Sequence, residues 1–241
     1  MPVNIRSLWS RLSMIVIAFT GLMARAETLL YNAEWRLMDA GRARITYAGD
    51  SAKLSLETIG IPGKLYRVKS DYSVSFNHEL CAQSASLHAE EGSKRRQAQV
   101  TYHSTTGKAD YIERDMLANK VVRTAEVNIP ACVHDVIAGL LKLRGAKLAP
   151  GQTTEIPISD GRKSAMVRVV AEKKETIKTP AGVFPCIRVE AFLFNNVIYR
   201  RKAKLLVWIA EDARRLPVQI RVQMPFYLGT VTLQLEKEEQ G

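Results

Sequence analysis

Residues 130–145 read PACVHDVIAGLLKLRG, and this stretch decides how the rest of the chain is interpreted. Its apolar residues recur with a helical period, because Val133, Val136, Ile137 and Leu140 fall at positions i, i+3, i+4 and i+7. The pattern predicts an amphipathic helix that must bury one face. Between position 27 and the end, the remainder of the chain shows the shorter periods typical of strands.

Residues at both ends of this stretch fit a helix. Pro130 prevents an earlier start, and Asp135 would lie in the first turn, where the helix dipole favours a carboxylate. Lys142 and Arg144 would lie in the last turn, and Gly145 could end the helix in the left-handed conformation. Arg144 lies close to the apolar stripe, so it needs an acceptor, either from the sheet or from the last helix carbonyls.

Fourteen short segments alternate between apolar and polar residues and are separated by turn residues. This pattern predicts an all-β fold, an antiparallel β-barrel or open β-roll of about a dozen strands, with the single amphipathic helix in mid-chain. The expected strands are residues 28–37, 42–47, 53–59, 71–76, 81–89, 95–102, 108–114, 120–129, 153–158, 163–172, 183–194, 199–209, 217–223 and 228–235. Gly41 is expected to supply the positive φ of the first hairpin, and residues 64–69 are expected to form a short helical or irregular connection.

Residues 1–26 have the features of a secretory signal peptide. Arg6 and Arg11 precede an apolar run over residues 12–24, which is shorter than the roughly 20 residues that span a bilayer. Ala24 and Ala26 fit a signal-peptidase site, so we expect cleavage after Ala26 and export to the periplasm, or secretion. No second membrane span follows, and residues 27–241 are interpreted as one β-rich domain.

The chain is basic, with a formal net charge of +11, which falls to +8 once Arg6, Arg11 and Arg25 are removed with the signal peptide. This charge favours anionic partners, such as anionic lipids or lipopolysaccharide. Export argues against nucleic acid as a partner. A basic surface that binds nothing is the competing interpretation.

Three cysteines, Cys81, Cys132 and Cys186, allow three single pairings. One disulfide is expected in an oxidising compartment, and we favour Cys81 with Cys132, which would fix the start of the helix to the preceding β region. Cys186 lies within a strand, where it is interpreted as a small buried residue, although its parity places it with Arg188 and Glu190.

Three motifs in order resemble the exported bacterial family DUF3108, a domain of unknown function. They are residues 130–144, TPAGVFPCIRVE (179–190) and VWIAEDARRLPV (207–218), supported by EGSKRR (91–96) and YLGTV (227–231). Family members often carry an aromatic pair where this chain has Leu141 and Lys142. The resemblance implies an exported, mostly antiparallel β protein and brings no known activity, cofactor or catalytic residue.

No catalytic or metal-binding motif is present in the sequence. His78-Glu79 begins like the helical zinc motif HExxH, but position 82 is alanine where the second histidine belongs. We therefore predict no enzyme activity, no cofactor and no metal site. A hydrolase whose site assembles only in three dimensions is the least favoured alternative.

Basic residues precede a strand that is apolar on both faces, residues 205–209. Arg200, Arg201 and Lys202, with Lys204 and the cluster at 94–96, could form a basic patch at the mouth of an apolar groove. Arg144 and Trp208 are weaker candidates for ligand contact, because an ion pair and a core position explain them more simply.

These observations lead to one functional hypothesis and one alternative. We expect a non-enzymatic envelope protein that binds or carries a hydrophobic, anionic component such as a lipid or lipopolysaccharide. The alternative is a structural or assembly partner of other envelope proteins, which would use a sheet edge. If neither holds, the basic residues would simply protect the edge from unwanted pairing.

Overall fold

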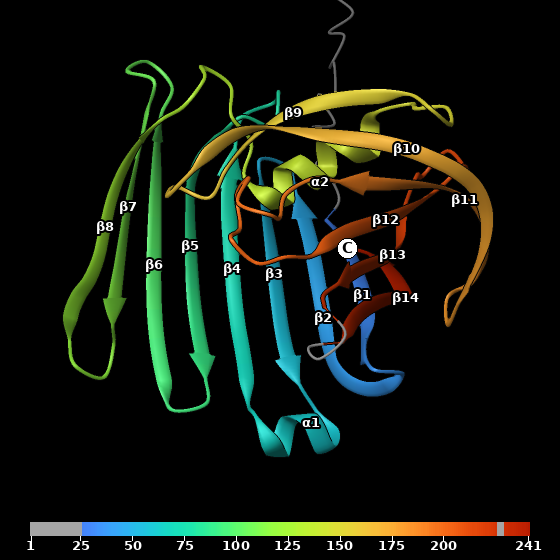
Figure 1. Cartoon of the computed structure of the whole chain (residues 1–241), viewed down its shortest axis with the longest axis horizontal. Coiled ribbons are helices and arrows are strands. Elements are labelled where there is room, and N and C mark those ends of the chain that lie inside the picture. Colours follow the sequence, from blue (N-terminus) through green and yellow to red (C-terminus); the bar gives the residue numbers. More distant parts are fainter. Residues whose placement is uncertain (1–25, 226–228) are drawn as a thin grey trace, which may run out of the picture.

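The protein forms one strongly curled antiparallel sheet of 14 strands (Figure 1). The structure, a computed structural model, describes residues 26–225 and 229–241, so the predicted signal peptide lies almost entirely outside the described residues. No helix within these residues is both long and apolar enough to cross a bilayer. The first eight strands are β1 (Glu27–Trp35), β2 (Met38–Ala48), β3 (Ser51–Thr58), β4 (Val68–Phe76), β5 (Ala82–Glu91), β6 (Lys94–His103), β7 (Lys108–Asp115) and β8 (Lys120–Asn128).

The second half of the chain supplies the other side of the curl. Its strands are β9 (Thr153–Ser159), β10 (Ser164–Thr179), β11 (Gly182–Ala191), β12 (Lys204–Ala210), β13 (Pro217–Gln223) and β14 (Thr230–Gln240). The strand order is β8 to β1 followed by β14 to β9, so β1 pairs with β14 in the middle, and β8 and β9 are the two ends. The sheet is therefore open, which confirms the predicted fold class in its β-roll form.

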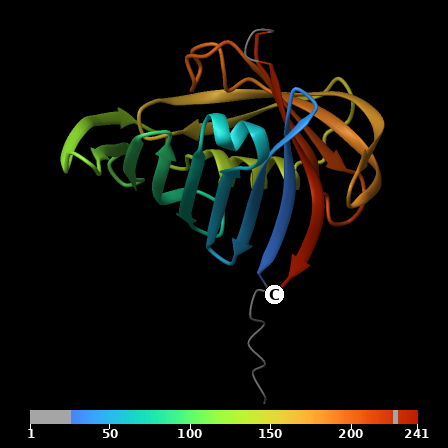
Figure 2. The same cartoon turned by 90° about the horizontal axis from the view of Figure 1, so that it is seen from below.

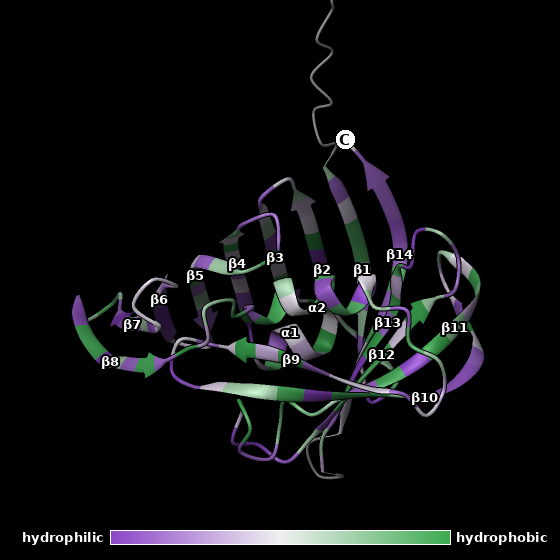
Figure 3. Ribbon diagram, turned by 90° about the horizontal axis from the view of Figure 1, so that it is seen from above, coloured by the Kyte–Doolittle hydropathy of each residue, from purple (hydrophilic) through white to green (hydrophobic). Residues whose placement is uncertain are grey.

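Helix α2 (Val136–Gly145) lies inside the curl, between the two halves of the sheet (Figures 1 and 3). Ile137 and Ala138 pack in one buried cluster, and Leu143 packs in a second cluster against β9 to β12. A Cβ atom at Gly139 would come within 2.4 Å of the Ile158 side chain, so glycine allows the helix to approach β9 closely. Apolar residues of two clusters therefore meet the helix, whereas the sequence pattern indicated one buried face.

The predicted start of this helix was wrong. Residues 130–135 are not helical, and Asp135 is the N-cap residue, whose carboxylate accepts bonds from the backbone N–H groups of Ile137 and Ala138. The backbone of His134 instead donates its N–H to the Pro157 carbonyl and accepts from the N–H of Ser159, so this segment pairs with the end of β9. The extended segment is set by the cap and by these tertiary bonds, which helical periodicity cannot reveal.

The predicted end of the helix also differs. Gly145 does not have a positive φ, and Ala146 caps the helix in an extended conformation. Arg215 reaches from the β12–β13 turn and donates to the carbonyls of Arg144 and Ala146, at 2.7 and 2.6 Å. A side chain distant in sequence therefore satisfies the carbonyls that a glycine turn would otherwise satisfy.

The first hairpin turns earlier than predicted. Its turn residues are Arg36 and Leu37, which both have positive φ, as a two-residue hairpin requires. Gly41 lies within β2, where a Cβ atom would come within 2.4 Å of the Glu57 carbonyl oxygen. Glycine is thus required by the close approach of β3 and not by a turn.

Three other segments differ from the sequence prediction. The connection from β3 to β4 contains a short helix, α1 (Gly60–Leu65), which begins earlier than the predicted connection. Strand β12 begins only at Lys204, so residues 192–203 are an irregular loop. Strand β14 continues to Gln240, which pairs with Glu27, beyond the predicted end of this strand at residue 235.

Candidate functional site

A groove runs along the concave face of the first half of the sheet, with a cavity volume of about 590 Å³. This volume lies within the range of about 300–1,000 Å³ that is typical of ligand sites. Side chains that face inward from β3 to β7 form its floor. The inward side chains on β5 and β6 include the small residues Ala85, Ala89 and Ala98, which leave the space that larger residues would fill.

The roof of the groove comes from elements that follow β8. Val136 and Ile137 of α2, residues 159–162 of the β9–β10 turn, and Tyr199 of the β11–β12 loop line it. The cap residue Asp135 fixes the helix to the floor, because it accepts a hydrogen bond of 2.8 Å from the Tyr72 hydroxyl of β4. Burial raises the pKa of Asp135, although the bonds that it accepts oppose this shift.

The apolar end of the groove adjoins a second cavity of about 190 Å³. Both cavities are lined by Leu54, Val136 and Ile137, and the remaining lining residues of the smaller one are apolar or glycine. A cavity of about 150 Å³ with such a lining stays dry and accepts benzene. The smaller cavity is therefore suited to a hydrocarbon chain.

The opposite side of the groove adjoins a basic pocket of about 690 Å³, which we call the mouth. The groove and the mouth share Asp160, Arg162 and Tyr199. The mouth is lined by five basic residues and one acidic residue. The basic residues are Arg123, Arg162, Lys163, Arg200 and Arg201.

Three of the five mouth cations have partners. Arg162 binds Asp160 at 2.6 Å, and Lys163 donates to a backbone carbonyl at 2.9 Å. Arg123 lies 3.9 Å from the carboxylate of Glu113. These cations are already engaged in the absence of a ligand.

The other two mouth cations are Arg200 and Arg201. Both are exposed, and neither forms an ion pair or a side-chain hydrogen bond with any residue of the described ranges. Their charges are therefore free to bind an anion that enters the mouth.

The end of the groove next to the β5–β6 turn, which we call its lower end, carries its own charged residues. Arg96 binds Asp115 at 2.7 Å, whereas Lys94 is exposed and forms no ion pair in the part of the chain described by the structure. Tyr111 donates to Glu113 at 3.0 Å, and burial raises the pKa of this tyrosine to about 12, so it remains a neutral donor. The groove thus combines apolar walls with polar and charged side chains, which make up twelve of its 21 lining residues.

The basic residues singled out from the sequence fall into two groups. Arg200 and Arg201 line the mouth, while Lys202 is exposed but outside it, and Arg95 binds Glu90 away from the groove. The loop that carries Arg200 and Arg201 lies beside the β9–β10 turn, which supplies other mouth residues.

Arg144 and Trp208 have structural roles. Arg144 binds the carboxylate of Glu27 with two nitrogens and also donates to the Arg214 carbonyl, at 2.7 Å from Nη2. Trp208 is buried and donates its indole N–H to Glu175 at 2.7 Å. Neither side chain lines the groove or the mouth.

Several groove residues were missed at the sequence level. Arg162 lies between two expected strands, in a Ser-Asp-Gly-Arg turn that was given no binding role, and Tyr199 was placed in a strand. The alanines of β5 and β6 gave a detectable signal, because small residues at inward positions indicate a hollow.

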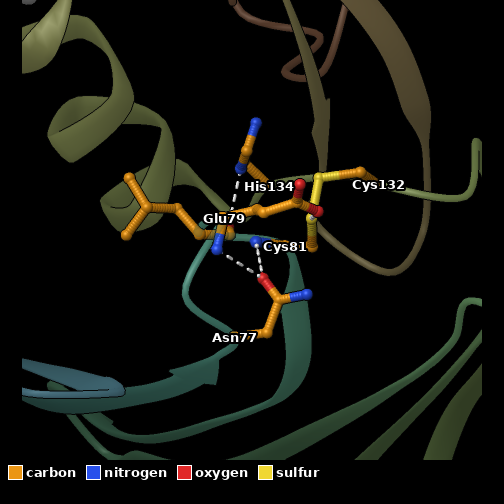
Figure 4. The surroundings of a disulfide bond; sticks show 6 residues. Asn77, Glu79, Cys81, Cys132 and His134 are labelled. Carbon is orange, nitrogen blue, oxygen red and sulfur yellow. Dashed lines mark hydrogen bonds between the residues drawn. A yellow bond between two sulfur atoms is a disulfide. The ribbon is translucent and has the colours of Figure 1, made fainter.

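A disulfide joins Cys81 and Cys132, the pairing favoured from the sequence (Figure 4). It fixes the segment before α2 to the start of β5, where Ala82 also donates its backbone N–H to the Val133 carbonyl. His134 lies beside it, with Nδ1 2.6 Å from the Leu80 carbonyl oxygen.

The third cysteine, Cys186, is a buried free thiol. Burial raises its pKa to about 12, so it remains protonated. This agrees with its interpretation as a small buried residue, despite the charged neighbours that share its parity in β11.

The surroundings of the disulfide contain one group of metal-type ligand atoms. Glu79, Cys81 and Cys132 have such atoms within 4.8 Å of one another. Both sulfurs belong to the disulfide, so they are not thiolates, which are the form that binds metal. Only the carboxylate of Glu79 remains as a ligand.

The histidines do not pair with a nucleophile within the described ranges. His134 is buried, and burial lowers its pKa, so the ring is neutral. Its single ring proton lies on Nδ1, which donates to the Leu80 carbonyl oxygen. His103 binds Asp110 at an exposed site on the sheet, 3.0 Å away. No histidine side chain bonds to a serine, threonine or cysteine side chain in the described part of the chain.

Comparison with solved structures supports the open β-roll. A crystal structure of a beta-barrel-like protein of the domain of unknown function DUF1849 from Brucella abortus is similar, with a TM-score of 0.57 and 8% identity, covering 91% of this chain and 99% of that one. A DUF1089 family protein from Pseudomonas aeruginosa gives a TM-score of 0.39 at 12% identity, covering 76% and 90% of the two chains, which is too low to support an argument. At these identities the first similarity shows the fold alone.

Sequence comparison identifies the family. No curated protein sequence matches the chain. The family of proteins of unknown function DUF3108 matches residues 30–236, which include all the groove and mouth residues described above. The chain therefore belongs to the DUF3108 family.

Proposed function

We propose that this protein binds or carries an anionic amphiphile of the cell envelope and has no enzymatic activity. The observation that carries the proposal is the adjacency of three cavities, because the groove shares lining residues with the basic mouth on one side and with the apolar cavity on the other. An anionic head group would bind at Arg200 and Arg201, and the hydrocarbon chain would lie under α2. The export predicted from residues 1–26 would bring the protein to such a ligand in the envelope.

The chemistry of the groove favours an amphiphile over a fully polar ligand. Leu54, Leu56 and Leu87 line it together with the three alanines of its floor. Burying hydrocarbon here gains about 25 cal/mol per Å² of apolar surface. A sugar or amino acid would lose hydration against these leucines and alanines and would leave their apolar surface unused.

Displacement of a fluorescent amphiphile tests the proposal. Dansyl-labelled undecanoic acid is bound to the purified exported protein and displaced by dodecyl phosphate or by the neutral dodecanol. We expect dodecyl phosphate to compete better, because Arg200 and Arg201 bind its head group. Absence of any binding of the fatty acid would contradict the proposal.

Two matched pairs of variants locate the site. Ala98→Phe fills the groove, whereas Gln99→Phe places the same ring on the opposite, exposed face of β6. The first should abolish displaceable binding and the second should preserve it. The double variant Arg200→Gln with Arg201→Gln should weaken the binding of dodecyl phosphate roughly fivefold, since the two exposed cations together contribute about 1 kcal/mol to the binding free energy. Lys202→Gln, outside the mouth, serves as the control.

A second candidate function is assembly with another envelope protein along β8. Strand β8 pairs only with β7, so its outer edge is open within the described sheet. An added strand would bind through backbone hydrogen bonds. Proline substitution of Glu126, an exposed β8 residue that lines neither the groove nor the mouth, should then abolish complex formation in a cross-linking assay while leaving dodecyl phosphate binding unchanged.

A further inference from the structure

Exposed apolar side chains gather at one end of the molecule, on the tips that join consecutive strands of the first half. The turn after β1, helix α1 and the turn after β7 all lie at this end, which is the lower end in Figure 1 and faces the viewer in Figure 2. Nine of the eleven large hydrophobic residues exposed in the described ranges belong to these tips or to the adjoining start of β8. They are Leu37, Met38, Ile61, Leu65, Tyr66, Met116, Leu117, Val121 and Val122. We call this set the lower rim.

The fold does not require these residues to be apolar. Leu37 is 94% exposed at a turn position with positive φ, where glycine or asparagine is the usual residue. Leu65 and Leu117 are 78% and 71% exposed. A concentration of exposed apolar residues at one place marks an interaction site.

Basic residues lie at all four tips, including the β5–β6 tip, which carries none of the nine apolar residues. Counted from the last residue of one strand to the first residue of the next, the tips are residues 35–38, 58–68, 91–94 and 115–120, and they contain five basic residues and two acidic residues. The basic residues are Arg36, Lys64, Arg67, Lys94 and Lys120. The lower rim therefore combines apolar insertion points with a positive charge, which is the chemistry that binds an anionic bilayer.

The spacing of the tips favours a bilayer over a protein partner. Successive tips are separated by two strands, which places them about 10 Å apart along the sheet edge. A protein interface needs a contiguous complementary patch, whereas a fluid lipid surface accepts separate side chains that each insert a short distance. Tyr66, with an apolar ring and a polar hydroxyl, suits the level of the lipid head groups.

We propose that the lower rim docks the protein on the surface of an anionic phospholipid bilayer, with Leu37, Leu65 and Leu117 inserted among the head groups. This docking goes beyond ligand binding in the groove and does not depend on it. It would also bring the lower end of the groove, at Lys94 and Arg96, to the bilayer surface, so that an amphiphile could pass between them.

Vesicle sedimentation tests the docking. The complete chain is expressed in an exporting bacterial host, and the exported product is mixed with vesicles of phosphatidylglycerol and phosphatidylcholine or of phosphatidylcholine alone. We expect binding to the anionic vesicles that falls as salt rises above about 0.1 M, where the screening length is about 10 Å. Failure to bind anionic vesicles, or equal binding to both kinds, would overturn the proposal.

A triple variant and a matched control identify the surface. Leu37→Ser, Leu65→Ser and Leu117→Ser together should weaken partitioning about tenfold or more, because three apolar insertion points are lost. Met166→Ser with Val183→Ser removes the other two exposed hydrophobic residues and should change it less than about twofold. An unchanged triple variant, or an equal loss in the control, would refute the assignment.

The groove and the lower rim can fail separately. Dodecyl phosphate binding without vesicles reports on the groove, and vesicle binding by the groove-filled Ala98→Phe variant reports on the rim. If Ala98→Phe lost vesicle binding, docking would depend on the groove ligand and the rim proposal would be wrong. The thermal unfolding midpoints of the surface variants should match the wild type.

Discussion

Asp135 is the residue whose replacement should most clearly show how the roof of the groove is held. Its carboxylate is 1% exposed and accepts three hydrogen bonds, from the N–H groups of Ile137 and Ala138 at 3.0 and 2.7 Å and from the Tyr72 hydroxyl at 2.8 Å. Asp135→Ala removes all three acceptors. The first turn of α2 would then lose its cap and its link to β4.

The magnitude follows from the partners that are left. Loss of an N-cap acceptor costs about 1–2 kcal/mol. Tyr72 is half-buried and its hydroxyl loses its partner as well, and an unsatisfied donor costs about 1–3 kcal/mol. We therefore expect Asp135→Ala to lower the free energy of unfolding by about 2–4 kcal/mol.

Urea unfolding at pH 7, followed by tryptophan fluorescence, measures this change. Tyr72→Phe removes only the hydroxyl, and a double-mutant cycle of the two substitutions should give a coupling of about 1 kcal/mol. Independent, additive effects of the two substitutions would refute the direct bond. A loss for Asp135→Ala smaller than about 0.5 kcal/mol, the low end of measured N-cap contributions, would show that the cap does not hold the helix.

Three further predictions concern stability. Replacing Cys81 and Cys132 with alanine should lower the free energy of unfolding by roughly 4 kcal/mol, given a sequence separation of 51, and a reductant should reproduce the loss in the wild type but not in the variant. Tyr31→Phe should lower the free energy of unfolding by about 1 kcal/mol, since the Tyr31 hydroxyl donates to a backbone carbonyl at 2.8 Å. Tyr47→Phe should leave it unchanged, because the buried Tyr47 hydroxyl has no partner in the described ranges. Equal losses for the two variants would contradict this. Burial raises the pKa of Asp135 above 3.8 in the folded state, so the stabilisation gained from its protonation is full below the unfolded-state pKa and is lost as pH rises through the folded-state pKa. The free energy of unfolding of the wild type, relative to that of Asp135→Asn, should therefore fall as pH increases from the unfolded-state pKa. A rise would show that the pKa is shifted in the opposite direction.

The all-β class could be predicted because each strand carries its own signal. Alternation such as Val218, Ile220 and Val222 is local, and the Asp160-Gly161 turn identifies a hairpin without knowledge of the fold. The run at residues 205–209, apolar on both faces, correctly indicated a strand buried on both sides. All 14 expected strands correspond to strands of the sheet, although several ends differ.

The differences arise where distant contacts outweigh local pattern. Residues 130–135 belong to the stretch predicted as helical but are not helical, because a disulfide and backbone bonds to β5 and β9 hold them. Gly41 resembles a turn residue but serves a close approach between strands. In both places, the deciding partner is far away in sequence.

The groove was only partly predictable for the same reason. The basic run at Arg200 and Arg201 was recognised, but its nearness to Arg162 depends on how two loops of the second half fold over the first. Arg144 was correctly expected to need an acceptor, yet its partner Glu27 could not be identified from spacing. Charge is visible in a sequence, whereas the arrangement of charges around a cavity requires the fold.

The measurement that tests the proposed function most directly is native mass spectrometry of the protein purified from its own exporting host, followed by lipid extraction. We predict a stoichiometric adduct with the mass of an anionic lipid, which is lost in Ala98→Phe and retained in Gln99→Phe. A wild-type protein that is free of any adduct and does not bind dodecyl phosphate would contradict the proposal that this groove holds an anionic amphiphile.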